Sequence, residues 1–203
     1  MKRLFLSSSF ADVSNIFIDF TNNDLKGKTI TFIPTASIHE TVNFYVEAGK
    51  QALTKMGLIV DELDISQAST KEISEKLQYN DYIYISGGNT FFLLQELQKT
   101  GADKIITQQI NSGKLYIGES AGSIILSPNI EYVKDLDDYN LAPKLQSFSA
   151  LNIIDFYPLP HYTNYPFKEN IEKIINKYNT DLNLYPITNS QAIEVKDNVA
   201  TIK

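Results

Sequence analysis

The stretch YIGESAGSIIL, residues 116–126, contains the most informative local pattern of the chain. Its first residues are typical of a strand, and the residues from Ala121 onward are typical of a helix. Ser120 lies at the junction, with Gly118 and Gly122 two residues away on either side. Small residues allow a sharp strand-to-helix turn, and free N–H groups at a helix start can stabilise an oxyanion. Ser120 is therefore a candidate nucleophile, and the alternative is a tight turn with an unreactive serine.

Upstream of this turn, short apolar runs alternate with amphipathic stretches. We predict strands over residues 3–9, 29–36, 58–65, 82–88 and 114–120, and helices over 10–22, 39–56, 70–79 and 90–111 with a break at Gly101. Alternation of this kind predicts an α/β fold with a mostly parallel, doubly wound sheet and right-handed crossovers.

The order changes after residue 126. Residues 127–149 have no clear period, 150–160 indicate a further strand, and 168–178 indicate a helix. The C-terminal stretch predicts strands with turns at Asn189–Ser190 and Asp197–Asn198. No repeat or linker interrupts the sequence, so we expect a single domain over residues 1–203.

Composition narrows the classes of function. The chain has 203 residues, no cysteine and a net charge of −6. The negative charge argues against nucleic acid or anionic membranes as partners, and the absence of cysteine excludes disulfides and zinc–thiolate sites. With no signal peptide recognised, we expect a cytoplasmic protein, a monomer or small homo-oligomer that uses no cofactor and no metal.

A second glycine-containing segment, Ser86–Gly87–Gly88–Asn89–Thr90, follows the predicted strand over residues 82–88. Backbone N–H groups of glycines at the carboxyl end of a strand can face a ligand crevice. The alternative is an ordinary turn in which Asn89 or Thr90 caps the next helix.

The chain offers two histidines as a possible base for Ser120. His161 follows a predicted strand and is surrounded by prolines, which restrict the local backbone, whereas His39 is more simply explained as a surface residue near a helix start. We therefore favour His161. An acid is needed to orient such an imidazole. The sequence leaves several candidates open: Asp135, Asp137, Asp138, Asp155 and Glu194.

Three segments together, YISGGNTFFLLQEL, YIGESAGSIIL and YPLPHYTN, resemble the peptidase E (aspartyl dipeptidase) and cyanophycinase family of serine peptidases. The resemblance covers nearly the whole chain, including LFLSSS and FIPTAS near the start. It implies a flavodoxin-like fold similar to that of the class I glutamine amidotransferases, in which a cysteine often takes the place of Ser120.

The resemblance also implies roles for individual residues. Ser120 would be the nucleophile, His161 the base and Asp135 the third member of the triad. The N–H groups of Gly88 and Ala121 would form the oxyanion hole.

This chain departs from the family pattern at two places. The position of a second acid used in the family matches Asn189, so Asp135, Asn189 and Glu194 all remain candidates for the third member. The family's arginine-rich segment after the histidine is replaced by YPFKENIEKI, with only Lys168 and Lys173. We expect Lys168 and Asn89 to contact substrate, and at most a modest preference for Asp-X dipeptides.

Taken together, these patterns predict a serine-type peptidase that cleaves a small peptide or related amide through an acyl-enzyme. The alternative is a catalytically weakened relative that acts as a binding module for a small ligand or peptide.

Overall fold

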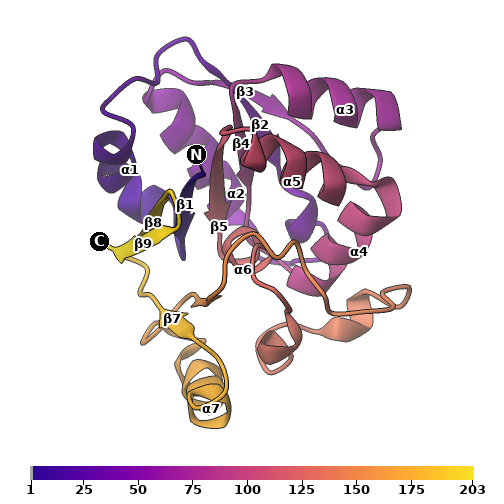
Figure 1. Cartoon of the computed structure of the whole chain (residues 1–203), viewed down its shortest axis with the longest axis vertical. Coiled ribbons are helices and arrows are strands. Elements are labelled where there is room, and N and C mark those ends of the chain that lie inside the picture. The colour runs from indigo at the N-terminus through magenta and orange to yellow at the C-terminus, as the bar shows by residue number, and fades with distance from the viewer. Residues whose placement is uncertain (1) are drawn as a thin grey trace.

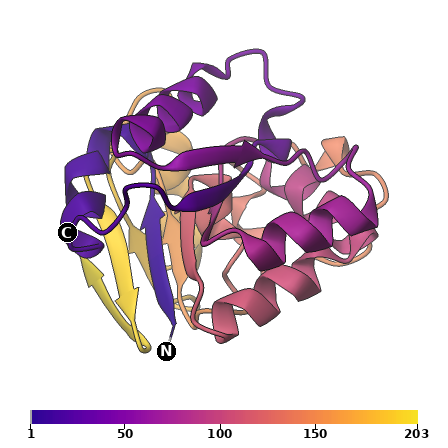
Figure 2. The same cartoon turned by 90° about the horizontal axis from the view of Figure 1, so that it is seen from above.

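A seven-stranded sheet organises the chain, of which the computed structural model describes residues 2–203. The strands, in chain order, are β1 (Arg3–Ser7), β2 (Thr29–Ile33), β3 (Ile59–Glu62), β4 (Tyr82–Ile85), β5 (Leu115–Glu119), β6 (Tyr157–Leu159), β7 (Leu184–Pro186), β8 (Ala192–Lys196) and β9 (Val199–Ile202). The order across the sheet is β3-β2-β4-β5-β1-β8-β9, and β6 and β7 pair separately. The first five strands are parallel to one another. At one edge of the sheet, β8 pairs antiparallel with β1, and β9 pairs antiparallel with β8 (Figure 2). The predicted mostly parallel, doubly wound sheet is confirmed.

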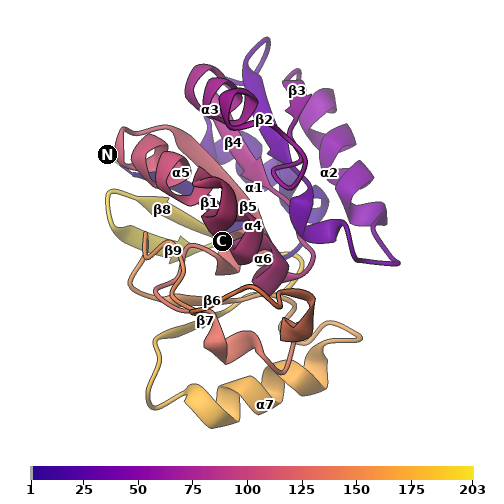
Figure 3. The same ribbon diagram turned by 90° about the vertical axis from the view of Figure 1, so that its right-hand side faces the viewer.

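Helices cover both faces of this sheet. They are α1 (Ser14–Phe20), α2 (Phe44–Lys55), α3 (Thr70–Tyr79), α4 (Thr90–Thr100), α5 (Ala102–Asn111), α6 (Ala121–Ile124) and α7 (Lys168–Tyr178), with 3₁₀ turns at Ala11–Val13, Thr35–Ser37, Glu131–Val133 and Tyr139–Leu141. Figure 3 shows α3 and α5 on one side of the strands and α2 on the other. Gly101, in the left-handed conformation with φ 77°, separates α4 from α5 as predicted.

Alternation of side chains along each strand divides the core into two layers. Leu4 and Leu6 of β1 pack with Ile83 and Ile85 of β4 on the face covered by α3–α6. The residues between them, such as Phe5, pack on the opposite face with aromatic residues of α1. Both faces of the parallel strands are therefore buried, as a doubly wound sheet requires.

A smaller unit is formed by residues 157–186, which contain β6, α7 and β7. The short parallel pair of β6 and β7 lies with α7 at one end of the molecule, below the main sheet in Figure 1. Ile171 and Ile174 of α7 are fully buried and join the same hydrophobic cluster as β1 and β4. The unit thus packs against the carboxyl-end side of the sheet through apolar contacts.

Two elements differ from the sequence-based prediction. The strand expected over 150–160 is limited to Tyr157–Leu159, because the N–H groups of Leu151 and Ile153 bond to the carbonyls of Ile125 and Leu126 instead of to a neighbouring strand. The helix expected over 39–56 begins only at Phe44. Among the described residues, no helix combines the length and apolar character needed to cross a membrane.

Candidate active site

The turn between β5 and α6 presents Ser120 in a strained backbone conformation. Its φ of 48° and ψ of −108° lie outside the regions that residues with a Cβ usually adopt. A Cβ at Gly118 would collide with the carbonyl of Gly122, and a Cβ at Gly122 would collide with the carbonyl of Ile85. The two glycines of the sequence motif therefore allow α6 to approach the strands closely enough to form the turn.

Ser120 and His161, 41 residues apart, meet at this turn. The Ser120 Oγ lies 2.9 Å from His161 Nε2, and His161 Nδ1 lies 2.9 Å from Asn189 Oδ1. An amide oxygen can only accept, so Nδ1 carries the ring hydrogen and Nε2 is free to accept a proton from the serine hydroxyl. This is the geometry of an activated nucleophile with an oriented base.

Several contacts hold the imidazole in place. The backbone N–H of His161 donates to Ser8 Oγ at 2.9 Å, and the Ser8 hydroxyl donates to the carbonyl of Ile187 at 3.0 Å. The ring of Phe167 stacks on the imidazole with centroids 4.6 Å apart. His161 itself has a positive φ of 64°, so its backbone is also constrained.

The surroundings also affect the protonation of His161. Burial lowers the pKa of the imidazole below its usual 6.5, and the hydrogen bond with Asn189 opposes this only partly. The ring is therefore neutral at neutral pH, which is the state that a general base needs.

The loop after β4 lies against the serine. A Cβ placed on Gly87 would be 3.2 Å from the Ser120 Cβ, and one placed on Gly88, whose φ is 130°, would collide with the backbone of Ala36. Among residues 2–203, no acceptor is assigned to the N–H of Gly88. Ala121 is the first residue of α6, where N–H groups have no partner within the helix. Both N–H groups can therefore donate to a ligand.

Glu119 lies immediately before the serine and is 2% exposed. Its carboxylate accepts from the backbone N–H of Phe10 at 2.9 Å and from the Tyr84 hydroxyl at 2.8 Å. Burial raises the pKa of Glu119 to about 7, and these hydrogen bonds counteract part of that rise. Sequence reasoning missed this residue, although a charged residue within an otherwise small and apolar turn was visible.

The expected third member, Asp135, is not at the imidazole. Asp135 is exposed, and the hydrogen bond with His161 Nδ1 that it was expected to make is made by Asn189 instead. Glu194 is also displaced, because it sits within β8 between Phe5 and Thr201 in the strand register. Of the three candidates, Asn189 is the one that contacts His161, because the loop after β7 returns to the carboxyl end of β1.

Other acids considered from the sequence serve different purposes. The Asp137 carboxylate accepts from the N–H of Thr90 at 2.9 Å, and burial raises its pKa to about 6. Asp138 caps the 3₁₀ turn at Tyr139–Leu141, and Asp155 is exposed. The second histidine, His39, is exposed and contacts Phe92 edge-on.

The two residues expected to contact substrate differ in their environment. Asn89 is 2% exposed and caps α4: its Oδ1 accepts from the N–H of Phe92, and its Nδ2 donates to the carbonyl of Asp138. Its side chain is thus engaged within the protein, and a contact between Asn89 and substrate stays a prediction. Lys168 is exposed at the start of α7, 4.0 Å from Glu172, and its contact with substrate stays a prediction.

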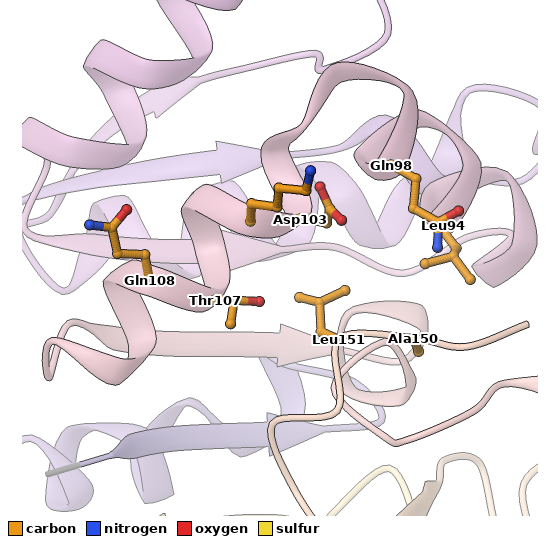
Figure 4. A pocket seen from close by; sticks show the side chains of 8 residues that line it. Leu94, Gln98, Asp103, Thr107, Gln108, Ala150 and Leu151 are labelled. Carbon is orange, nitrogen blue, oxygen red and sulfur yellow. The ribbon is translucent and has the colours of Figure 1, made fainter.

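Surface cavities lie elsewhere on the molecule. One of about 320 Å³ is formed by α4, α5 and the segment at Ala150–Leu151 (Figure 4), and one of about 550 Å³ lies over α2 and β3. Neither is lined by Ser120 or His161, and within the described residues no group of three metal-ligating side chains is arranged to hold a metal ion. The candidate site is therefore defined by the side chains around Ser120.

Several known proteins are similar to this chain in sequence and fold. The model of Peptidase family S51 matches residues 4–203. The uncharacterized peptidase Lmo0363 of Listeria monocytogenes is 57% identical, covering 97% of this chain and 95% of its own length. Peptidase E of a Nostoc species is 29% identical over 80% of this chain and 66% of its own length. A crystal structure of a candidate peptidase E protein from Listeria monocytogenes superposes with a TM-score of 0.96 and 55% identity, covering 100% of this chain and 98% of that one. The chain therefore belongs to peptidase family S51 and is a serine-type peptidase.

Proposed function

We propose that this chain hydrolyses a small peptide through an acyl-enzyme on Ser120, with His161 as general base. The single observation that supports this most strongly is the hydrogen-bonded series from Ser120 Oγ through His161 to Asn189 Oδ1, with both distances at 2.9 Å. The strained turn presents Ser120 as the nucleophile. The loop at Gly87–Gly88 and the start of α6 supply two N–H donors beside it.

In the first half of the reaction, Ser120 Oγ attacks the carbonyl carbon of the scissile bond while His161 Nε2 takes the hydroxyl proton. The oxygen of the tetrahedral intermediate accepts from the N–H groups of Gly88 and Ala121. As the intermediate collapses, the C–N bond breaks and His161 gives its proton to the leaving amine.

In the second half, a water molecule attacks the ester carbonyl of the acyl-enzyme. His161 takes a proton from that water, and the second tetrahedral intermediate collapses with cleavage of the C–O bond to Ser120. The proton on Nε2 returns to the serine oxygen. Asn189 keeps the hydrogen on Nδ1 throughout, so Nε2 stays available for each proton transfer.

The substrate class is supported by relatives named peptidase E, and we propose a dipeptide or similarly short peptide. An amide at position 189 cannot stabilise an imidazolium as a carboxylate does. This observation favours the second candidate function, a weakly catalytic protein that mainly binds a small peptide at the same site.

The test compares the wild-type chain with Ser120→Ala on a panel of dipeptides, together with labelling by a fluorophosphonate probe. We expect Ser120→Ala to lose hydrolysis by several orders of magnitude, and the probe to modify Ser120 in the wild-type chain. His39→Ala is the control and should retain activity. Peptide binding by the wild-type chain without labelling or turnover would favour the binding function, and activity retained in Ser120→Ala would disprove the proposed mechanism.

A further inference from the structure

The first turn of α2 places an aromatic ring beside the candidate nucleophile. Ring atoms Cε2 and Cδ2 of Tyr45 lie 3.4 Å and 3.7 Å from the position that a Cβ on Gly87 would take, and that same position is 3.2 Å from the Ser120 Cβ. The ring is half-buried, and its hydroxyl is buried without a hydrogen-bond partner among residues 2–203. Because the hydroxyl is enclosed, a ligand at this site meets the carbon atoms of the ring.

Tyr45 and His161 lie on opposite sides of Ser120 across the sheet. Ser120 follows β5, whose neighbours in the sheet are β4 and β1. Tyr45 packs on the loop after β4, whereas the backbone N–H of His161 is bonded to Ser8, directly after β1. In the proposed reaction His161 gives its proton to the leaving amine, so the leaving half of the substrate lies on the β1 side. The acyl half, which in a dipeptide is the N-terminal residue, then lies on the β4 side, next to Tyr45.

The surface next to Tyr45 is apolar. Phe44 is 74% exposed and contacts the Tyr45 ring edge-on, with ring centroids 6.1 Å apart, and Val42 is exposed two residues earlier. The same segment lies along the start of α4, where the His39 ring contacts that of Phe92 edge-on, with centroids 4.4 Å apart. Exposed apolar side chains that gather on a surface mark a place where a ligand or partner binds. This surface is continuous with the candidate site through Tyr45, so the ligand that fits it is the substrate.

We propose that Tyr45 and Phe44 form an aromatic subsite for the side chain of the substrate's N-terminal residue, and that this residue is aromatic or large and apolar. The inference rests on the proposed function, because it takes Ser120 as the nucleophile and His161 as the group that protonates the leaving amine. An aromatic side chain in the subsite removes apolar surface from water and makes edge-to-face contacts with the two rings.

An acidic side chain fits this side of the site less well. The Asp137 carboxylate lies at the start of α4, where it accepts from the N–H of Thr90, two residues after Gly88. Burial raises the pKa of Asp137 to about 6, so the group is mostly ionised at neutral pH. A second carboxylate brought to the β4 side would be repelled by this charge. The subsite therefore favours Phe-X over Asp-X dipeptides.

Kinetics on the dipeptide series X-Ala and Ala-X, with X as Phe, Leu, Ala or Asp, test the inference. We expect kcat/KM of the wild-type chain for Phe-Ala to exceed that for Ala-Ala and Asp-Ala by about tenfold or more, since one methylene group in an apolar pocket changes it about 10- to 200-fold. The Ala-X series should vary much less. Equal values for Phe-Ala, Ala-Ala and Asp-Ala, or a stronger dependence in the Ala-X series, would overturn the inference and leave the proposed function intact.

Variants assign the preference to the two rings. Tyr45→Ala should lower kcat/KM for Phe-Ala about tenfold more than for Ala-Ala, whereas Tyr45→Phe, which retains the ring, should retain the preference for Phe-Ala. Phe44→Ala covers the case in which Tyr45→Ala does not fold, because Phe44 is exposed, and it should weaken the same preference. Tyr79→Ala is the matched control: this aromatic residue is 80% exposed at the end of α3, and its removal should change neither series.

Sedimentation velocity of the wild-type chain and Phe44→Ala tests a second copy of the chain as the rival occupant of this surface. A wild-type dimer that Phe44→Ala dissociates, with the preference for Phe-Ala unchanged, would overturn the inference. Hydrolysis that persists in Ser120→Ala, or the absence of turnover of every dipeptide, would instead overturn the proposed function, and this inference with it.

Discussion

At the scale of single residues, the amide of Asn189 distinguishes this site from a Ser–His–Asp triad. Its Oδ1 fixes the tautomer of His161 at 2.9 Å, which is one of the two tasks of the usual aspartate. The other task, stabilising the positive imidazolium, needs a negative charge that an amide lacks. The site is therefore well oriented but electrostatically incomplete.

Asn189→Asp should raise kcat, by about tenfold if the added charge is the main deficit. The carboxylate should also raise the pKa of His161, which burial now holds below 6.5. Activity is lost as the pH falls and the imidazole takes up a proton, so the acid limb of the pH profile should move to higher pH. Asp135→Asn is the control and should leave kcat within about twofold, since an exposed substitution remote from the imidazole has little effect. An unchanged kcat and pH profile in Asn189→Asp would contradict the role given to Asn189.

Glu119 should also make stability depend on pH. Its pKa is about 7 in the folded protein against an ordinary 4.5, so between these values the folded state keeps a proton that the unfolded chain has released. The free energy of unfolding should therefore decrease as the pH rises from 4.5 to 7, by on the order of 3 kcal/mol. Urea denaturation at pH 5 and pH 8 should show this decrease in the wild-type chain and a smaller one in Glu119→Gln. Equal decreases in the two proteins would contradict the prediction.

At the scale of elements, the close approach of α6 to β4 creates the turn at Ser120. Gly122 is the point of contact, because a Cβ there would collide with the carbonyl of Ile85. Backbone atoms on both sides make this contact rigid, so the helix has to move if the side chain grows.

Gly122→Ala should therefore lower the free energy of unfolding by about 3 kcal/mol or more, the upper end of the usual overpacking cost. Gly101→Ala is the matched control: a Cβ at Gly101 meets nothing within 4 Å, and only the left-handed backbone is strained. Its cost should be about 1 kcal/mol. Urea denaturation of both variants measures the difference, and similar costs would show that space around α6 is not limiting.

At the scale of the whole molecule, the site joins two structural units. Ser120 belongs to the main sheet, whereas His161 and Asn189 follow the strands of the small β6–β7 pair. Ser8, at the carboxyl end of β1, links the two units through the N–H of His161 and the carbonyl of Ile187.

Ser8→Ala should lower kcat because the imidazole loses an anchor to the main sheet, and the loss of buried hydrogen bonds should cost about 1–3 kcal/mol of stability. Ser9→Ala, at the half-buried neighbouring position, is the control and should change neither quantity appreciably. Steady-state kinetics and urea denaturation test both variants. A Ser8→Ala protein with wild-type kcat would show that α7 and Phe167 hold the imidazole without this link.

Much of the architecture follows from local patterns in the sequence. The alternation of apolar and amphipathic runs predicted the parallel strands and their helices, and the period of Ile171 and Ile174 predicted α7 at its observed bounds, Lys168–Tyr178. The stretch over 150–160 was misjudged because its apolar residues suit a strand, while its N–H groups are bonded by the end of α6. Pairing partners of that kind are invisible in a local pattern.

For the candidate site, the sequence by itself determined the sharp turn at Ser120, since the spacing of small residues is a local property. It also determined the identity of the nearby histidine, since the chain has only two histidines to choose from. Only the tertiary structure decided the partner of that histidine. Asp135 and Asn189 lie at similar distances from His161 along the chain, on opposite sides of it. Asp135 is nevertheless exposed to solvent, whereas the return of the chain after β7 brings Asn189 to the imidazole. Glu119 acquires its contacts in the same way, from loops that only the sheet order brings together. The physical reason is that hydrogen bonds between side chains depend on distances in space, which follow from how the strands are ordered and not from spacing along the chain.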